Sequence, residues 1–167
     1  VTMQASRHLL FAAISLLIVL LDWGTKQFMQ DWLAIENVIE VAPGFRFVLV
    51  HNHGAAFGLL SSAGGWQRGL FMGLAIVVSG YLIWRLWLAR PSEDFFNLGL
   101  VLILGGAIGN LIDRATLGYV VDFIDLYVGD WHWPAFNVAD TAITLGALVV
   151  VLDSFGIWRR PRAESVE

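Results

Sequence analysis

Residues 95–114 have the sequence FFNLGLVLILGGAIGNLIDR, in which a long apolar run ends in polar and charged side chains. A run of about 20 such residues is long enough to cross the hydrocarbon core of a bilayer as a helix. At its end, Asn110, Asp113 and Arg114 are spaced i, i+3 and i+4, so they share one helix face. The stretch therefore predicts a membrane-spanning helix with a polar face at one end.

Three other segments have a similar length and composition, at residues 9–28, 69–88 and 141–158, beside the span at 95–112. Because the chain between them is short, the sequence predicts one integral membrane domain over residues 1–167. We expect an all-α membrane protein, a bundle of four transmembrane helices.

Two local features refine this bundle. Gly105 and Gly109 form a small-xxx-small pair, which lets a second helix approach closely. The first apolar segment could instead be a secretory signal, since Arg7 precedes it, but no small-x-small cleavage site follows. We therefore interpret it as the first transmembrane helix.

The composition agrees with lipid as the main solvent. Hydrophobic residues make up 57% of the chain and charged residues only 14%, against about 25% charged in soluble domains. The net charge of −4 removes the broad basic surface that nucleic-acid binding needs, so no nucleic-acid partner is expected. The absence of cysteine excludes disulfides, thiolate metal sites and a cysteine nucleophile.

The basic residues predict the orientation, because cytoplasmic loops are rich in Lys and Arg. Six of the ten lie before the first segment, between the second and third, or after the fourth: Arg7, Arg85, Arg90, Arg159, Arg160 and Arg162. Both termini are then cytoplasmic, with a polar tail at 159–167. The longer connections, about 29–68 and 113–140, are extracytoplasmic.

The outer connections carry the other structural signals. Residues 38–41 and 45–50 are β-rich and flank the turn dipeptide Pro43-Gly44, which predicts a small extracytoplasmic β-hairpin or cradle. We also expect a short loop helix in these connections. Pro134 should end regular structure just before the last helix.

Polar side chains gather at the outward ends of the predicted helices. Ionisable groups near membrane depth are costly, so they are candidates for function. The cytoplasmic ends show only anchoring arginines. The outward group comprises Asp22, Thr25, Lys26, Asn110, Asp113, Arg114, Asp122, Asn137 and Asp140.

Several of these residues have a purely structural interpretation. Asn137 and Asp140 fit an N-cap and an acid in the first helical turn. Asp122 and Asp125 could be solvated loop carboxylates. These alternatives remain open from the sequence alone.

The charged pairs also have a purely structural interpretation. Asp22 with Lys26, and Asp113 with Arg114, could be interfacial ion pairs that only fix the depth of a helix. For Asp22 and Lys26 we favour this structural role.

Other chemistries have weaker support. His51, His53 and His132 could imitate a zinc site, but they lack the HExxH helix of zinc peptidases. Ser61 and Ser62 lack a helix-borne histidine partner for a serine nucleophile. We therefore predict neither a metal nor a serine mechanism.

A pair of carboxylates remains. If Asp122 and Asp140 come together, one can hold a proton while the other stays ionised, because two adjacent like charges cannot both ionise cheaply. The ionised carboxylate can take a proton from an attacking water, while the protonated partner donates a hydrogen bond to a peptide carbonyl.

Five sequence blocks carry a family resemblance across nearly all of the chain except its tail. They are DWGTK at 22–26, NHGAAF at 52–57, GGAIGNLIDR at 105–114, GYVVDF at 118–123 and PAFNVAD at 134–140. In these blocks, and in their order, the chain resembles bacterial lipoprotein signal peptidase (signal peptidase II), a family of inner-membrane aspartic proteases.

The resemblance implies roles for individual residues. Asp122 and Asp140 match the catalytic aspartates of the family motifs, whereas Asp125 does not. The residues implied to bind substrate or orient the pair are Asn52, Asn110, Arg114 and Asn137. The residues implied to support the site are Asp22, Lys26, Gly54 and Asp113.

The resemblance also implies a reaction. The family removes signal peptides from prolipoproteins by cutting just before a cysteine that carries a diacylglyceryl group, with neither a metal nor an organic cofactor. The implied location is the bacterial inner membrane, with the active site at the outer, periplasmic interface. Its implied partners are the lipidated precursor and membrane lipid, and we expect a monomer.

Two alternatives belong to other classes of protein. A small proton-coupled carrier would use intramembrane carboxylates as a relay, but it should distribute them through the bilayer. A structural membrane subunit would use its glycines for helix packing and would not need Asp122 or Asp140.

Overall fold

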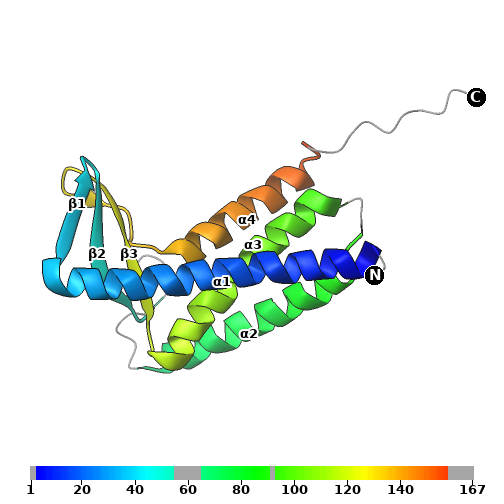
Figure 1. The fold of residues 1–167 in the computed structure, drawn as a ribbon, viewed down its shortest axis with the longest axis horizontal. Coiled ribbons are helices and arrows are strands. Elements are labelled where there is room, and N and C mark those ends of the chain that lie inside the picture. Colours follow the sequence, from blue (N-terminus) through cyan, green and yellow to red (C-terminus); the bar gives the residue numbers. More distant parts are fainter. Residues whose placement is uncertain (1–2, 55–64, 91–92, 158–167) are drawn as a thin grey trace, which may run out of the picture.

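The computed structural model describes residues 3–54, 65–90 and 93–157. In this part of the chain a bundle of helices carries a small sheet at one end (Figure 1). The helices are α1 (Met3–Glu36), α2 (Trp66–Trp87), α3 (Asp94–Thr116) and α4 (Val138–Ser154). The strands are β1 (Val38–Ala42), β2 (Phe45–Asn52), β3 (Val120–Val128) and β4 (Trp131–His132).

Helix α3 is the centre of the bundle and packs against α1, α2 and α4. Its glycines allow this close approach. A Cβ atom on Gly105 would lie 2.8 Å from the Cβ atom of Ile18 in α1. A Cβ atom on Gly109 would lie 2.7 Å from Oδ2 of Asp22. The predicted packing role of the two glycines is confirmed.

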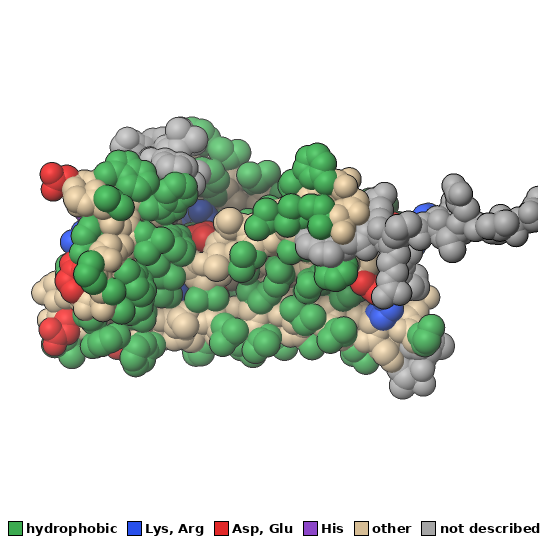
Figure 2. Space-filling view, turned by 90° about the horizontal axis from the view of Figure 1, so that it is seen from above, with side chains coloured by type: hydrophobic (Ala, Val, Ile, Leu, Met, Phe, Trp, Pro, Cys, Tyr) green, Lys and Arg blue, Asp and Glu red, His purple; other side chains and the backbone are tan. Residues whose placement is uncertain are grey.

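The bundle exposes large apolar side chains and buries several charged and polar ones, as expected of a protein in lipid. On α1, Leu16, Leu17 and Leu20 are each more than half exposed, whereas Asp22 and Lys26 are buried at 1% exposure. Figure 2 shows hydrophobic side chains over most of the helical surface on one face. The chain is therefore a multi-pass membrane protein.

Length and composition indicate which of the described helices can cross a bilayer. α1, α2 and α3 are long and apolar enough to span a bilayer. Helix α4 has 17 residues and is shorter. The described chain begins and ends at the same end of the bundle, away from the sheet (Figure 1).

The sheet is antiparallel, with the strand order β1-β2-β3-β4. The predicted hairpin is confirmed as β1 and β2. The prediction of an all-α protein with only a hairpin was incomplete, because β3 and β4 extend the hairpin into a sheet. β3 and β4 come from the connection between α3 and α4, and β3 pairs with β2, so that Val50 lies opposite Asp122. β3 was not predicted as a strand, because two aspartates interrupt its apolar residues.

Helix α1 continues to Glu36, well beyond the predicted end at residue 28. Its last turns pack under the sheet, where Met29 and Leu33 form a buried cluster with Phe123 of β3. The expected short loop helix is absent from the described residues of the connections between α1 and α2 and between α3 and α4; residues 55–64 lie outside the described residues.

Candidate active site

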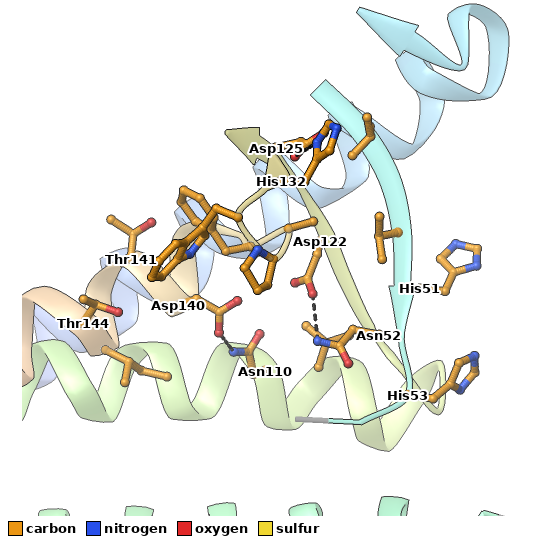
Figure 3. A pocket seen from close by; sticks show the side chains of 18 of the residues that line it. His51, Asn52, His53, Asn110, Asp122, Asp125, His132, Asp140, Thr141 and Thr144 are labelled. Carbon is orange, nitrogen blue, oxygen red and sulfur yellow. Dashed lines mark hydrogen bonds and ion pairs between the residues drawn. The ribbon is translucent and has the colours of Figure 1, made fainter. Parts of the chain in front are cut away.

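A cavity of about 1110 Å³ lies where the sheet meets α3 and α4 (Figure 3). Its walls come from β2, β3, the segment before α4 and the first turns of α4. Polar side chains occupy its inner part: Asn52, Asn110, Arg114, Asp122 and Asp140. Val48, Val50, Pro134, Phe136, Ile143 and Leu145 make much of the rest apolar.

Asp122 is on β3 and is buried, at 1% exposure. Its Oδ1 accepts a hydrogen bond from Asn137 Nδ2 at 2.7 Å, and its Oδ2 accepts one from Asn52 Nδ2 at 2.9 Å. Burial, with a further contribution from the nearby Asp140 carboxylate, raises the pKa of Asp122 to about 7. The solvated-loop interpretation is therefore wrong for this residue.

Asp140 is in the first turn of α4. Asn137 is the N-cap of this helix, since its Oδ1 accepts the Asp140 backbone N–H at 2.8 Å. The cap starts the helix at Val138, three residues before the predicted start. The Asp140 carboxylate accepts a hydrogen bond from Asn110 Nδ2 at 2.7 Å. Figure 3 shows Asp122 and Asp140 on the same cavity.

A buried ion cluster lies behind this pair. Lys26 Nζ is 2.6 Å from Asp22 Oδ2 and 2.9 Å from Asp113 Oδ2, and it donates to Asn110 Oδ1 at 3.1 Å. The pairing of Asp22 with Lys26 is confirmed. The alternative interpretation of Asp113 and Arg114 as an ion pair is wrong, because packing of α1 against α3 brings Lys26 to Asp113.

The two carboxylates of this cluster also hold backbone of other elements. Asp22 Oδ1 accepts the N–H of Ala139 at 2.9 Å, at the start of α4. Asp113 Oδ2 accepts the N–H of Val121 at 3.1 Å, beside Asp122 on β3. The cluster therefore connects β3, which carries Asp122, and α4, which carries Asp140, to α1 and α3.

Arg114 holds the end of β2. Its Nη2 donates to the carbonyl oxygen of Gly54 at 3.1 Å, and its guanidinium lies 5.4 Å from the ring centre of Phe71 on α2. The N–H of Gly54 in turn donates to Asn52 Oδ1 at 3.0 Å. This chain of contacts directs the Asn52 amide nitrogen toward Asp122.

The three histidines considered for zinc do not form a common site. His51 and His53 lie against Tyr119, with ring centres 4.3 and 5.4 Å apart, respectively. His132 instead hydrogen-bonds to Asp125. Within the described ranges, no group of three metal-ligating side chains could hold a metal ion.

Sequence reasoning missed one cluster. Asp125 is buried, at 5% exposure, and contacts both Arg46 and His132. The solvated-loop interpretation is wrong for Asp125 too. Nothing in the local sequence links it to Arg46, 79 positions earlier, because only the β2–β3 register brings them together.

Two carboxyl groups held by side-chain amides beside a largely apolar cavity can act as a general acid and a general base toward a carbonyl substrate. The fold and the site thus define a multi-pass membrane protein equipped for hydrolysis. The family model of signal peptidase II matches residues 14–156, and the chain belongs to this family of peptidases.

Individual relatives cover most of the chain. A lipoprotein signal peptidase of Alteromonas mediterranea is 46% identical over 145 residues, which is 87% of this chain and 80% of that protein. A lipoprotein signal peptidase of Acinetobacter baylyi is 47% identical over 150 residues, or 89% and 83% of the two chains.

The fold also matches a solved structure. A protein described as a bacterial membrane enzyme superposes with a TM-score of 0.78 at 27% sequence identity, over 94% of each chain. The resemblance seen in the sequence blocks is therefore confirmed at the level of family and fold.

Proposed function

We propose that this chain is an aspartic endopeptidase that removes the signal peptide from prolipoproteins, with Asp122 and Asp140 as its catalytic pair. The cut falls just before the cysteine that carries the diacylglyceryl group. The observation that carries the proposal is the link through Asn137, which donates to Asp122 and caps the helix turn that bears Asp140.

The reaction follows from the two carboxyl groups. The ionised carboxylate takes a proton from a water molecule as its oxygen attacks the scissile carbonyl carbon. The protonated carboxyl donates its hydrogen bond to the carbonyl oxygen. When the tetrahedral intermediate collapses, the C–N bond breaks and the amine of the cysteine leaves with a proton from the pair. A pKa of about 7 for Asp122 supports this sharing of one proton near neutral pH.

The side-chain amides orient the pair. Asn52 and Asn137 hold the two oxygens of Asp122, and Asn110 holds Asp140. Arg114 fixes Asn52 through Gly54 and leaves a positive charge beside the cavity, where substrate main chain or developing negative charge can use it. Because the carboxyl pair activates water by itself, the reaction needs neither a metal nor an organic cofactor.

The location follows from the charges. Arg7 reaches the carbonyl oxygen of Arg90 and the carboxylate of Asp94, at the end of the bundle far from the cavity. Arginines at that end support a cytoplasmic side, and α4 then completes a fourth crossing. The cavity consequently lies at the outer interface of the bacterial inner membrane.

That depth suits the substrate. A precursor with a signal helix in the bilayer and a lipid on its cysteine can reach the cavity laterally from lipid. We also propose that the enzyme acts as a monomer.

The test is cleavage of a diacylglyceryl-modified prolipoprotein in detergent, followed by gel shift, beside the same precursor without lipid. We expect wild type to cut only the lipidated form, and Asp122→Asn or Asp140→Asn to cut neither. Asp130→Asn is the matched control, since Asp130 is an exposed aspartate in the turn after β3. Full turnover by either catalytic-pair variant would overturn the mechanism. No cleavage by folded wild type would favour a carrier or a structural subunit.

A further inference from the structure

A second polar cluster occupies the outer end of the same cavity. Arg46 Nε donates to Asp125 Oδ2 at 2.7 Å, and His132 Nδ1 lies 3.0 and 2.9 Å from the two oxygens of Asp125. All three residues line the cavity. Figure 3 shows Asp125 and His132 side by side, apart from Asp122 and Asp140.

Asp125 holds two donors in fixed positions. Burial raises its pKa, but the hydrogen bonds and the charge interactions with His132 and Arg46 together outweigh burial and bring the pKa below its usual value. The carboxylate is therefore ionised at neutral pH. The Arg46 guanidinium also lies 5.1 Å from the ring centre of Tyr127, which restricts it further.

These contacts leave hydrogen-bonding groups of both side chains unused. Arg46 Nη1 is 3.8 Å from the nearest oxygen of Glu40, which is too long for a hydrogen bond. Within residues 3–54, 65–90 and 93–157, neither Nη atom of Arg46 nor Nε2 of His132 makes a hydrogen bond. Arg46 and His132 therefore present hydrogen-bonding groups to any molecule that occupies the cavity.

The register gives the distance from the reacting bond. Asp122 lies opposite Val50, and Asp125 lies opposite Arg46. The interval holds three residues on β3 and four on β2, because the register shifts between Phe47 and Val50. Three residues of extended strand cover about 10 Å. An extended peptide whose scissile bond lies at Asp122 therefore reaches Arg46 after about three residues. The side chains of Val48 and Val50 line the cavity between the two places.

The proposed function also sets the direction of the peptide. A signal helix must lie along the bundle, within the bilayer. The segment that follows the scissile bond therefore runs toward the sheet, where the cluster is (Figure 1).

We propose that Arg46 and His132 form a subsite for the main chain of the mature segment, about three residues beyond the scissile bond. Asp125 is its positioning residue. Arg46 donates to a peptide carbonyl oxygen. Because every residue has a carbonyl group, the subsite accepts different mature sequences. This inference rests on the proposed peptidase function.

The test uses two synthetic diacylglyceryl lipopeptides with the same signal sequence. One ends a single residue after the cysteine, and the other continues for six residues. The measurement is the ratio of kcat/KM for the long substrate to that for the short one, in detergent. We expect a ratio well above one for wild type, and a decrease of about tenfold in Arg46→Gln, mainly through KM.

Companion variants separate binding from structure. His132→Gln and Asp125→Asn should also decrease the ratio, and Arg46→Lys should restore part of it because it keeps the charge without the planar fork. Asp130→Asn should keep the wild-type ratio. A merely structural cluster would lower kcat/KM for both substrates equally and leave the ratio intact.

The outcomes distinguish the two proposals. A wild-type ratio near one, or an unchanged ratio in Arg46→Gln, overturns the subsite while the peptidase function stands. Failure of wild type to cut either lipopeptide overturns the function and the subsite together.

Discussion

Asn137 Nδ2 lies 2.7 Å from Asp122 Oδ1, so the N-cap residue of α4 also holds a carboxylate of the neighbouring sheet. The other end of the same amide accepts the N–H of Asp140. One buried side chain therefore starts the last helix and sets the position of Asp122 relative to Asp140. Its two tasks can be separated by substitution.

Asn137→Ala removes the cap and the donor, whereas Asn137→Ser keeps an acceptor for the helix N-terminus but is too short to reach Asp122. We expect the alanine variant to lose about 1 kcal/mol for the cap, and about 1–3 kcal/mol more for the unpaired buried groups. The serine variant should be the more stable of the two. Both should lose at least about tenfold in kcat, since one hydrogen bond to a charged group is lost. Unfolding in detergent and cleavage rates check this, and wild-type kcat in the serine variant would contradict it.

Lys26→Met should be strongly destabilising. It leaves Asp22 and Asp113 without their counter-ion in the bundle, and breaking a buried pair in this way costs about 3–5 kcal/mol. Arg85→Met is the control, because Arg85 and Glu93 form a partly exposed pair that contributes about 1 kcal/mol or less. Denaturant unfolding of both variants gives the comparison, and equal losses would refute the buried-charge argument.

Gly109→Ala should loosen the contact between α1 and α3. The added methyl would lie 2.7 Å from Asp22 Oδ2, so the helices or the Asp22 carboxylate must move, at a cost of about 1–3 kcal/mol. Gly73→Ala on α2 is the matched control, because a Cβ atom there meets nothing within 4 Å. Thermal unfolding of the two variants in the same detergent should differ in this sense. A larger loss for Gly73→Ala would contradict the packing role.

Asp122 predicts a pH dependence of stability. Its pKa is about 7 in the folded protein and near 3.8 in an unfolded chain, so the folded state retains a proton that the unfolded state releases. The contribution to stability is fully present below pH 3.8 and is lost as the pH rises through about 7. The unfolding free energy of Asp122→Asn, measured from pH 4 to 8, should lack this decrease. An identical slope in wild type and variant would show that Asp122 does not titrate there.

The rate of cleavage should also depend on the proton that Asp122 binds. If the pair needs one shared proton, kcat/KM should decline above about pH 7, as that proton is lost. A cleavage profile that is flat between pH 6 and 9 would remove this requirement.

Patterns with a short range could be predicted from the sequence. The apolar runs, the shared face of Asn110 and Asp113, and the cap at Asn137 depend on spacing within one element, which the helix period fixes. The hairpin also followed from a local turn. The end of α1 could not be predicted, because its last turns are stabilised by Phe123 from a distant strand.

The amino-acid sequence by itself determined that this is a membrane protein with its polar residues at one end of its helices, and its motifs determined the family. Only the tertiary structure decided which charges meet. Lys26, and not Arg114, pairs with Asp113, and Asp125 pairs with Arg46 through the β2–β3 register. The reason is that local geometry fixes the face on which a side chain lies, whereas its partner depends on helix packing and strand register, which depend on the whole chain.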